Sequence, residues 1–192
     1  MNDRPPLPSP HEVQGDSARY GALLQVVEAI ATHSDLSTLI QDLARLLPLL
    51  VPVNFVGLSL YDAQRGVMRL HVLEANVPAD IIGGQEAPPA DTPAGLVWDT
   101  QRPLLINDLT KESRWPTIVG LMREDGVQSC CLVPLTSVDR QLGALEFSSL
   151  QPSAYGEQDL DLMQQIGRQV AVAVENVLNR EAANASRRDV ER

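Results

Sequence analysis

Strand-like segments follow one another directly in this chain instead of alternating with helices. Residues 54–61 and 67–73 are apolar runs separated by the turn-like sequence DAQRG, and residues 128–135 and 141–149 are separated by TSVDR. Strands joined by such short connections pair antiparallel, because a parallel pair needs a long crossover. The order of segments therefore predicts an antiparallel sheet flanked by helices, a fold of the α+β class.

Helical periodicity surrounds these strand pairs. Two of the expected helices have clear start signals: Asp35 can cap one, and Thr92 followed by Pro93 can begin another. Pro48 and Pro52 are expected to close the helix that Asp35 begins, and residues 74–91 form a long loop rich in Pro and Gly. Helices are predicted from residue 18, over 36–47, 93–101, 113–124 and 156–179, with a further short strand at 103–106.

The domain organisation follows from composition and periodicity. Residues 1–17 hold four prolines among polar residues and are predicted to be a disordered extension. Residues 18–179 are expected to form one domain, and residues 180–192 a polar, helix-permissive linker toward an output domain that is not part of this sequence.

The only two cysteines of the chain are adjacent, in the strand-like sequence SCCLVPL. Neighbouring strand residues point to opposite faces, so Cys130 and Cys131 cannot share a face. With a turn at residues 137–140, Cys131 is predicted to face Glu146 and Ser129 to face Ser148, which gathers four polar residues on one face. A bond between adjacent cysteines would distort the strand, and a metal site would need further Cys or His ligands nearby.

Two stretches carry a resemblance to a known family. The sequence GVQSCCLVPLTSVDRQLGALEFSS, followed by AYGEQDLDLMQQIGRQVAVAVENVL, resembles the end of a GAF domain, and DTPAGLVWDTQRPLLINDL resembles its middle. The resemblance is strongest to GAF domains of bacterial regulators of the formate-hydrogenlyase-activator type. It implies a six-stranded antiparallel sheet with helices on one face and a ligand pocket on the other.

The same resemblance implies where that pocket lies. It would occupy the mixed face of the sheet, under a cover made of residues 74–95 and the short helix that follows. The residues implied as ligand-binding are Ser129, Cys131, Glu146, Ser148, Leu96 and Trp98. No cofactor and no metal are implied. For Glu146, a buried pocket carboxylate and a partly solvated residue at the sheet rim are both consistent with the sequence.

Specialised activities known in the family lack their motifs here. Free methionine-R-sulfoxide reductases use separate cysteines across the pocket, whereas these two are adjacent and point apart. Bilin attachment uses a cysteine usually followed by His, and nitric-oxide-sensing iron sites use an Asp, Cys and Arg cluster; neither pattern occurs. An NKFDE-like stretch of cyclic-nucleotide pockets is also missing. His71 is best explained as a solvated strand residue and Asp108 as a turn or capping residue.

The final predicted helix carries a broad apolar stripe. A sheet alone would not cover so wide a surface, so the stripe favours a helical partner. The first helix is similar, and the resemblance implies that both pair between two subunits as a homodimer. The stripe consists of Leu160, Met163, Ile166, Val170, Ala173, Val174 and Val177, widened by Leu162, Gly167, Ala171 and Leu178.

Charge and hydropathy limit the possible partners. A net charge of −10 argues against direct binding of nucleic acid or of an anionic membrane surface. No run approaches the length of a membrane span and no signal peptide is evident, so a cytoplasmic location is expected.

Three functions remain open from the sequence. The leading hypothesis is a bacterial regulatory GAF domain that binds a small-molecule effector and acts through a dimeric helical bundle on an output domain, either a sigma-54-type transcription activator or a sensor kinase. The second is a GAF-fold enzyme of the free methionine-R-sulfoxide reductase type. The third is a dimerisation module with a vestigial pocket. The effector is not identified; the resemblance suggests formate.

Overall fold

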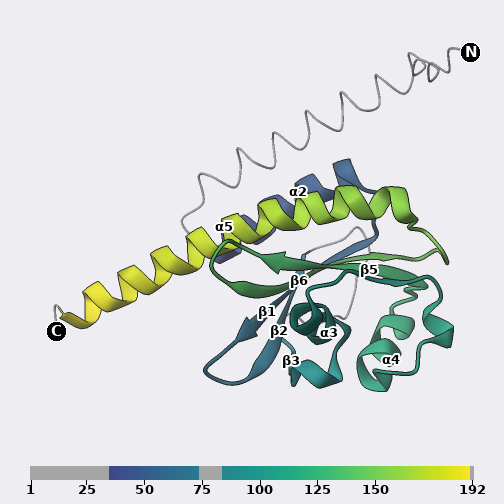
Figure 1. Ribbon diagram of the computed structural model, residues 1–192, viewed down its shortest axis with the longest axis horizontal. Helices are drawn as coiled ribbons and strands as arrows, with labels where there is room; N and C mark the ends of the chain where they lie inside the picture. Colours follow the sequence, from purple (N-terminus) through teal and green to yellow (C-terminus); the bar gives the residue numbers. More distant parts are fainter. Residues whose placement is uncertain (1–34, 74–83, 191–192) are drawn as a thin grey trace, which may run out of the picture.

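The computed structural model describes residues 35–73 and 84–190, and they contain one six-stranded antiparallel sheet (Figure 1). The order across the sheet is β3-β2-β1-β6-β5-β4, with every neighbouring pair antiparallel. This confirms the predicted α+β class and the six-stranded sheet. The strands are β1 (Phe55–Asp62), β2 (Val67–Leu73), β3 (Glu86–Ala87), β4 (Leu104–Ile106), β5 (Ser129–Thr136) and β6 (Gln141–Ser149).

Helices lie on both faces of the sheet (Figure 1). The helices α2 (Leu36–Leu50) and α5 (Glu157–Val190) cover one face, and α3 (Pro93–Thr100) and α4 (Pro116–Glu124) lie on the other. Two short 3-10 turns, η1 (Pro89–Asp91) and η2 (Leu109–Lys111), precede α3 and α4. The predicted disordered extension at 1–17 and the helix expected from residue 18 lie outside the described residues.

The predicted helix starts are present. The Asp35 carboxylate accepts a hydrogen bond from the Thr38 backbone N–H (2.9 Å), and the Thr92 hydroxyl accepts one from the Gly95 N–H (2.9 Å). Each bond satisfies an N–H that the first turn of a helix leaves unpaired. The expectation that Pro48 closes α2 was wrong, since Pro48 lies inside the helix, which continues to Leu50. Leu50 is buried in the core, and this burial favours completing the last turn.

The apolar stripe of α5 is buried within a single chain. Met163, Ile166, Val170 and Val174 are fully buried, in one core cluster with residues of α2 and of the sheet. The stripe therefore has the helical partner that the sequence favoured, and within one chain that partner is α2. The second half of α5 extends beyond the sheet (Figure 1), and the described side chains there are mostly exposed.

A second core lies between the sheet and the helices α3 and α4. Phe55, Leu132 and Ala144 contribute to it from the strands, and Val97 and Val119 from the helices. The sheet thus separates two apolar layers, so that each strand supplies alternate residues to one layer or the other.

The pairing of β5 with β6 contains an irregularity that decides which face each residue takes. Thr136 pairs with Gln141, but Leu135 pairs with Gly143, so Leu142 is left without a partner. One extra residue in one strand is a β-bulge, and it shifts the pairing of everything beyond it by one residue. The predicted pairing was wrong for this reason: Cys131 lies opposite Phe147, and Glu146 lies opposite Leu132.

Candidate functional site

Two of the predicted polar residues, Glu146 and Ser148, lie on the face of the sheet that carries α3 and α4. They alternate along β6 with Leu145 and Phe147, which belong to the core on the other face. In the neighbouring strand β1, Gly57 lies opposite Glu146. The face predicted to hold a pocket is therefore built from β1, β2 and β6.

A cavity of about 110 Å³ opens between this face and α4. A neighbouring cavity of about 320 Å³ lies toward β3 and the start of α3. A site for a small molecule is typically a concave, mostly apolar cavity with few polar groups. Described residues that line both cavities are Leu70, Gln85, Ile118, Leu121 and Glu146.

Glu146 is the polar centre of this site. The Ser148 hydroxyl donates a hydrogen bond to its Oε1 (2.6 Å). Burial raises the pKa of Glu146, and the hydrogen bond from Ser148 opposes part of that rise. The carboxyl group therefore sits in surroundings that disfavour its charge, which a ligand offering hydrogen bonds or positive charge would compensate.

Gly57 leaves space beside that carboxylate. A Cβ atom placed on Gly57 would lie 3.5 Å from the Glu146 Cβ and 3.4 Å from a methyl of Leu70. A larger side chain at this position would extend into the first cavity, which Gly57 lines. The missing side chain is thus one of the features that keeps the cavity open.

The other two predicted polar residues belong to the opposite face. Cys131 is fully buried among α5-side core residues, so the prediction that it shares a face with Glu146 was wrong, as the bulge in β6 explains. Ser129 is also buried; its hydroxyl donates to the Gln151 carbonyl (2.6 Å) and accepts from the Ala154 N–H (3.3 Å). These bonds tie the end of β5 to the segment before α5, which is a structural role.

Both thiols are in surroundings that suppress their reactivity. Cys130 and Cys131 are free and buried, in the cores on opposite faces of the sheet. Burial raises the pKa of Cys130 well above its usual value and that of Cys131 to about 12. Because the thiolate is the nucleophile and the metal ligand, neither group is poised for such chemistry at neutral pH.

Leu96 and Trp98, the two predicted site residues on α3, lie beside the site and do not line either cavity. The Trp98 ring stacks on Tyr61, with centroids 3.9 Å apart, and its indole N–H donates to the Gln141 carbonyl (3.1 Å). Leu96 packs at the edge of the core between the sheet and α3. Neither Leu96 nor Trp98 is among the described residues that line the two cavities.

The structure explains the role of Asp108 and describes the surroundings of His71. Asp108 accepts hydrogen bonds from the Thr110 hydroxyl and backbone N–H (2.5 and 3.0 Å), and these bonds, with help from Lys111, lower its pKa to about 2. It caps η2, as the capping interpretation predicted. His71 is half-buried, and burial together with the Arg69 charge lowers its pKa. Within the described residues, no three His, Cys, Asp or Glu side chains are grouped as a metal site would require.

Several residues of the cavity were not recognised in the sequence. Leu70, Gln85, Ile118 and Leu121 come from β2, the segment before β3, and α4, and only tertiary structure brings them together. Gly57 did carry a signal, because an isolated glycine inside a strand often marks the close approach of another group or of a ligand.

Comparison with known proteins agrees with this architecture. Residues 33–175 match the family described as GAF domain. The chain is 26% identical over 164 residues to the formate hydrogenlyase transcriptional activator FhlA of Escherichia coli (strain K12), a match that covers 83% of this chain and 23% of FhlA. The chain therefore spans about a quarter of that relative's length.

Two solved structures share the fold at low sequence identity. One is the GAF domain of a phosphoenolpyruvate-protein phosphotransferase from Coxiella burnetii (TM-score 0.73, 16% identity, covering 86% of this chain and 98% of that one). The other is the free methionine-R-sulfoxide reductase of Neisseria meningitidis in complex with its substrate (TM-score 0.67, 16% identity, covering 93% and 99%). Among the described residues, none of the helices combines the length and the hydropathy of a membrane span.

Proposed function

This chain belongs to the GAF domain family, and from that premise we propose that it is a regulatory module, not an enzyme, that binds a small-molecule effector. The effector occupies the cavity beside Glu146, and binding is passed through α5 to an output domain. The observation that carries this proposal is the position of Glu146: it lines the cavity, while its chain neighbours Leu145 and Phe147 pack in the core with α5.

The contact between the sheet and α5 supports the relay. A Cβ atom on Gly167 of α5 would lie 2.9 Å from a Val133 methyl and 3.2 Å from the Pro134 carbonyl oxygen. So close an approach leaves little freedom for β5 and α5 to move independently. A ligand that shifts β6 and its partner β5 would shift α5 with them. Because α5 continues to Val190, well past the sheet, it is placed to carry that displacement outward.

The output domain is a sigma-54-type transcription activator or a sensor kinase in this proposal. The relative FhlA is a transcriptional activator, and the matched region is only 23% of its length, which fits one sensory module within a longer regulator. We place the protein in the cytoplasm. We also propose that it works without a cofactor. Residues 180–192 then form the helical linker toward the output domain.

The same proposal includes a homodimer, but the apolar stripe of α5 is not the surface that would form it. Since the α5 stripe is buried in one chain, the contact would use the exposed second half of α5 and apolar residues left at the surface, among them Val172, which is 46% exposed. Sedimentation that finds only monomer at tens of micromolar would contradict this part.

The enzyme alternative is disfavoured by the thiols. A reductase of the free methionine-R-sulfoxide type requires reactive cysteines at the pocket, and both cysteines here are buried with raised pKa values, in separate cores. The fold likeness to the Neisseria enzyme is at 16% identity and concerns the fold alone. A turnover assay with free methionine-R-sulfoxide tests this alternative directly, and no activity is expected.

A thermal-shift screen of common metabolites tests the leading proposal against a vestigial pocket. Gly57→Leu places a side chain into the first cavity, and Gly120→Leu is its matched control, because no atom lies within 4 Å of a Cβ at Gly120 on α4. We expect a compound that raises the melting temperature of the wild type and of Gly120→Leu but not of Gly57→Leu. Equal binding by all three proteins would move the site elsewhere, and no binding at all would support the vestigial module.

A further inference from the structure

The charged side chains that line the two cavities beside Glu146 are acidic, unlike those of a site that binds an anion. Their described lining contains four carboxylates and no lysine, arginine or histidine. Glu146 lines both cavities, Glu124 and Asp125 line the smaller one, and Glu86 lines the larger one. A small anion entering either cavity would meet the buried Glu146 carboxyl group, and like charges repel strongly where water is partly excluded.

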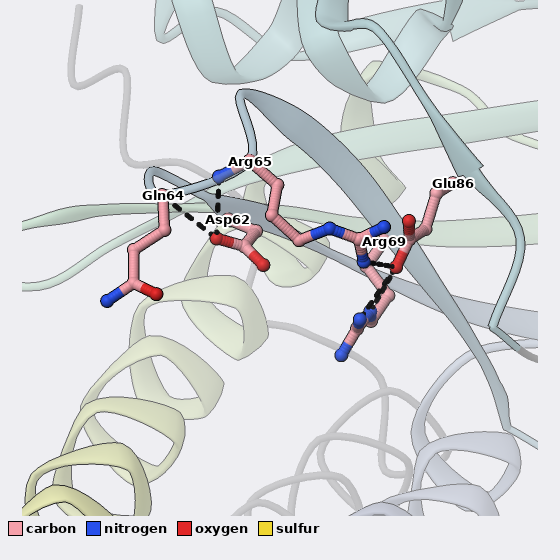
Figure 2. Close-up of polar contacts among 5 residues, drawn as sticks. All are labelled: Asp62, Gln64, Arg65, Arg69 and Glu86. Atoms are coloured by element: carbon pink, nitrogen blue, oxygen red, sulfur yellow. Dashed lines mark hydrogen bonds and ion pairs between the residues drawn. The ribbon is translucent and has the colours of Figure 1, made fainter.

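The arginines closest along the chain to the cavity residues are engaged elsewhere. Arg69 forms an ion pair with Glu86 (2.6 Å), and Arg65 also binds that carboxylate (Figure 2). Arg69 neighbours Leu70 in β2, so it points to the face of the sheet opposite to Leu70, and the Glu86 carboxylate that it binds lies on that face as well. The Arg123 guanidinium on α4 donates to the Leu109 carbonyl (2.8 Å). None of the three presents its charge to Glu146.

The ten residues that follow β2 in the sequence carry no cationic side chain. Residues 74–83, between β2 and the segment that leads into β3, contain two acidic residues and no lysine, arginine or histidine. Whatever their placement, they cannot supply the positive charge that a carboxylate or phosphate ligand needs. Recognition of such anions usually relies on Arg, Lys or an array of backbone N–H groups.

The apolar part of the lining indicates the other half of the ligand. Leu70 of β2 faces Ile118 and Leu121 of α4 across the cavities, and Phe55 and Met122 line the smaller one. These side chains favour a hydrocarbon body, whose burial removes apolar surface from water. The one polar group common to both cavities besides Gln85 is the Glu146 carboxyl, and an ionised carboxylate can only accept hydrogen bonds.

We infer that the effector has an apolar body and an N–H or O–H donor group directed at Glu146, either positively charged or neutral, and that small anions such as formate are excluded from this site. The inference rests on the proposed function and specifies its ligand class. A protonated amine is the best occupant, because it satisfies the carboxylate with both charge and hydrogen bonds.

A matched series of probes tests this class without knowledge of the natural effector. n-Butylammonium, n-butanol and butyrate share one apolar chain and differ in charge, and formate is the smallest carboxylate. Each is titrated at millimolar concentrations into the ¹⁵N-labelled 192-residue chain, with the Gly57 and Glu146 amide signals as the readout of cavity binding. We expect n-butylammonium to bind at least about tenfold more tightly than butyrate, and formate not to move these signals.

Two variants connect the preference to one carboxylate. Glu146→Gln keeps the size and the hydrogen-bond acceptor but removes the charge, so the preference for n-butylammonium should disappear while n-butanol still binds. Glu124→Gln, at an exposed position of the same cavity, should keep most of the preference. Dispersed spectra of both variants confirm that they are folded.

The possible outcomes separate the ligand class from the proposed function. Butyrate or formate moving the Gly57 signal at lower concentration than n-butylammonium would overturn the ligand class and leave the cavity as a binding site. An equal response to all probes, unaffected by Glu146→Gln, would also overturn the ligand class. No shift with any probe would contradict the cavity itself as a site, and with it the proposed function.

Discussion

Gly143→Ala is the substitution that tests the geometry of the site most sharply. Gly143 follows the extra residue of the β6 bulge and pairs with Leu60 of β1. An added Cβ there would lie 1.9 Å from the Ser59 carbonyl oxygen and 3.0 Å from the Leu60 Cα. These neighbours are backbone atoms, so no side-chain rotation can relieve the clash.

The expected cost follows from how far the strands would have to move. Cβ atoms in proteins stay at least 3.0 Å from such neighbours, so β1 and β6 would have to separate by about 1 Å in the middle of the sheet. Overpacking of a core costs about 1–3 kcal/mol, and a fixed backbone neighbour places this case at or above the upper end. We expect Gly143→Ala to lower the free energy of unfolding by about 3 kcal/mol or more.

Gly57→Ala is the matched control, because it adds the same methyl group to a glycine of the adjacent strand. Its Cβ would meet only ordinary contacts at 3.4 Å and beyond. Since alanine also restricts the unfolded chain, its effect should stay within about 1 kcal/mol of the wild type. Urea unfolding followed by far-UV circular dichroism measures both variants. A Gly143→Ala midpoint equal to that of Gly57→Ala would refute the bulge and the register that places Glu146 at the cavity.

Three further predictions concern the thiols, the buried carboxyl and the relay contact. Cys130→Ser and Cys131→Ser should each lower the free energy of unfolding by about 1–3 kcal/mol, because each places a hydroxyl in an apolar core. A variant whose urea unfolding matches that of the wild type would contradict the burial of the cysteine that it replaces. Burial raises the pKa of Glu146 in the folded protein above its ordinary value of 4.5. The contribution of Glu146 to the free energy of unfolding is therefore present below pH 4.5 and is lost as the pH rises through the pKa of the folded state. Glu146→Gln should therefore gain stability on the wild type at neutral pH, with the gain shrinking in acid, and a gain that grows in acid would contradict this. Gly167→Ala should lower the free energy of unfolding by about 1–2 kcal/mol, because its Cβ would lie 2.9 Å from a β5 side chain. Gly120→Ala, in open space on α4, is the control and should be neutral or stabilising. Equal unfolding midpoints of the two variants would contradict the close contact between α5 and β5.

The sequence allowed the class of fold to be predicted because its signals are local. Asp35 and Thr92 cap the helices they were expected to begin, and the directly joined strand runs pair antiparallel as their short connections require. Glu146 and Ser148 were placed on one face together, since two residues separated by one always share a face of a strand. Such features depend on a few neighbouring residues.

Features that depend on tertiary contacts were not predictable in the same way. The bulge at Leu142 lies in β6, which pairs with both β1 and β5, and it moved Cys131 to the other face. Gly143 was the available signal, because a lone glycine inside a strand often marks a bulge. The burial of α5 depends on α2, and the cavity depends on Ile118 from a distant helix, and neither relation is visible in a local pattern.

The central claim is that occupation of the cavity beside Glu146 changes the state of α5, and hydrogen exchange read by mass spectrometry tests it directly. The exchange of the wild-type chain is measured with and without the best-binding compound of the metabolite screen, in two regions: β6 around Glu146, and residues 175–190 of α5. The account predicts a change of protection in both regions, and its absence from both in Gly57→Leu. Protection confined to β6, with α5 unchanged at saturating compound, would contradict the relay.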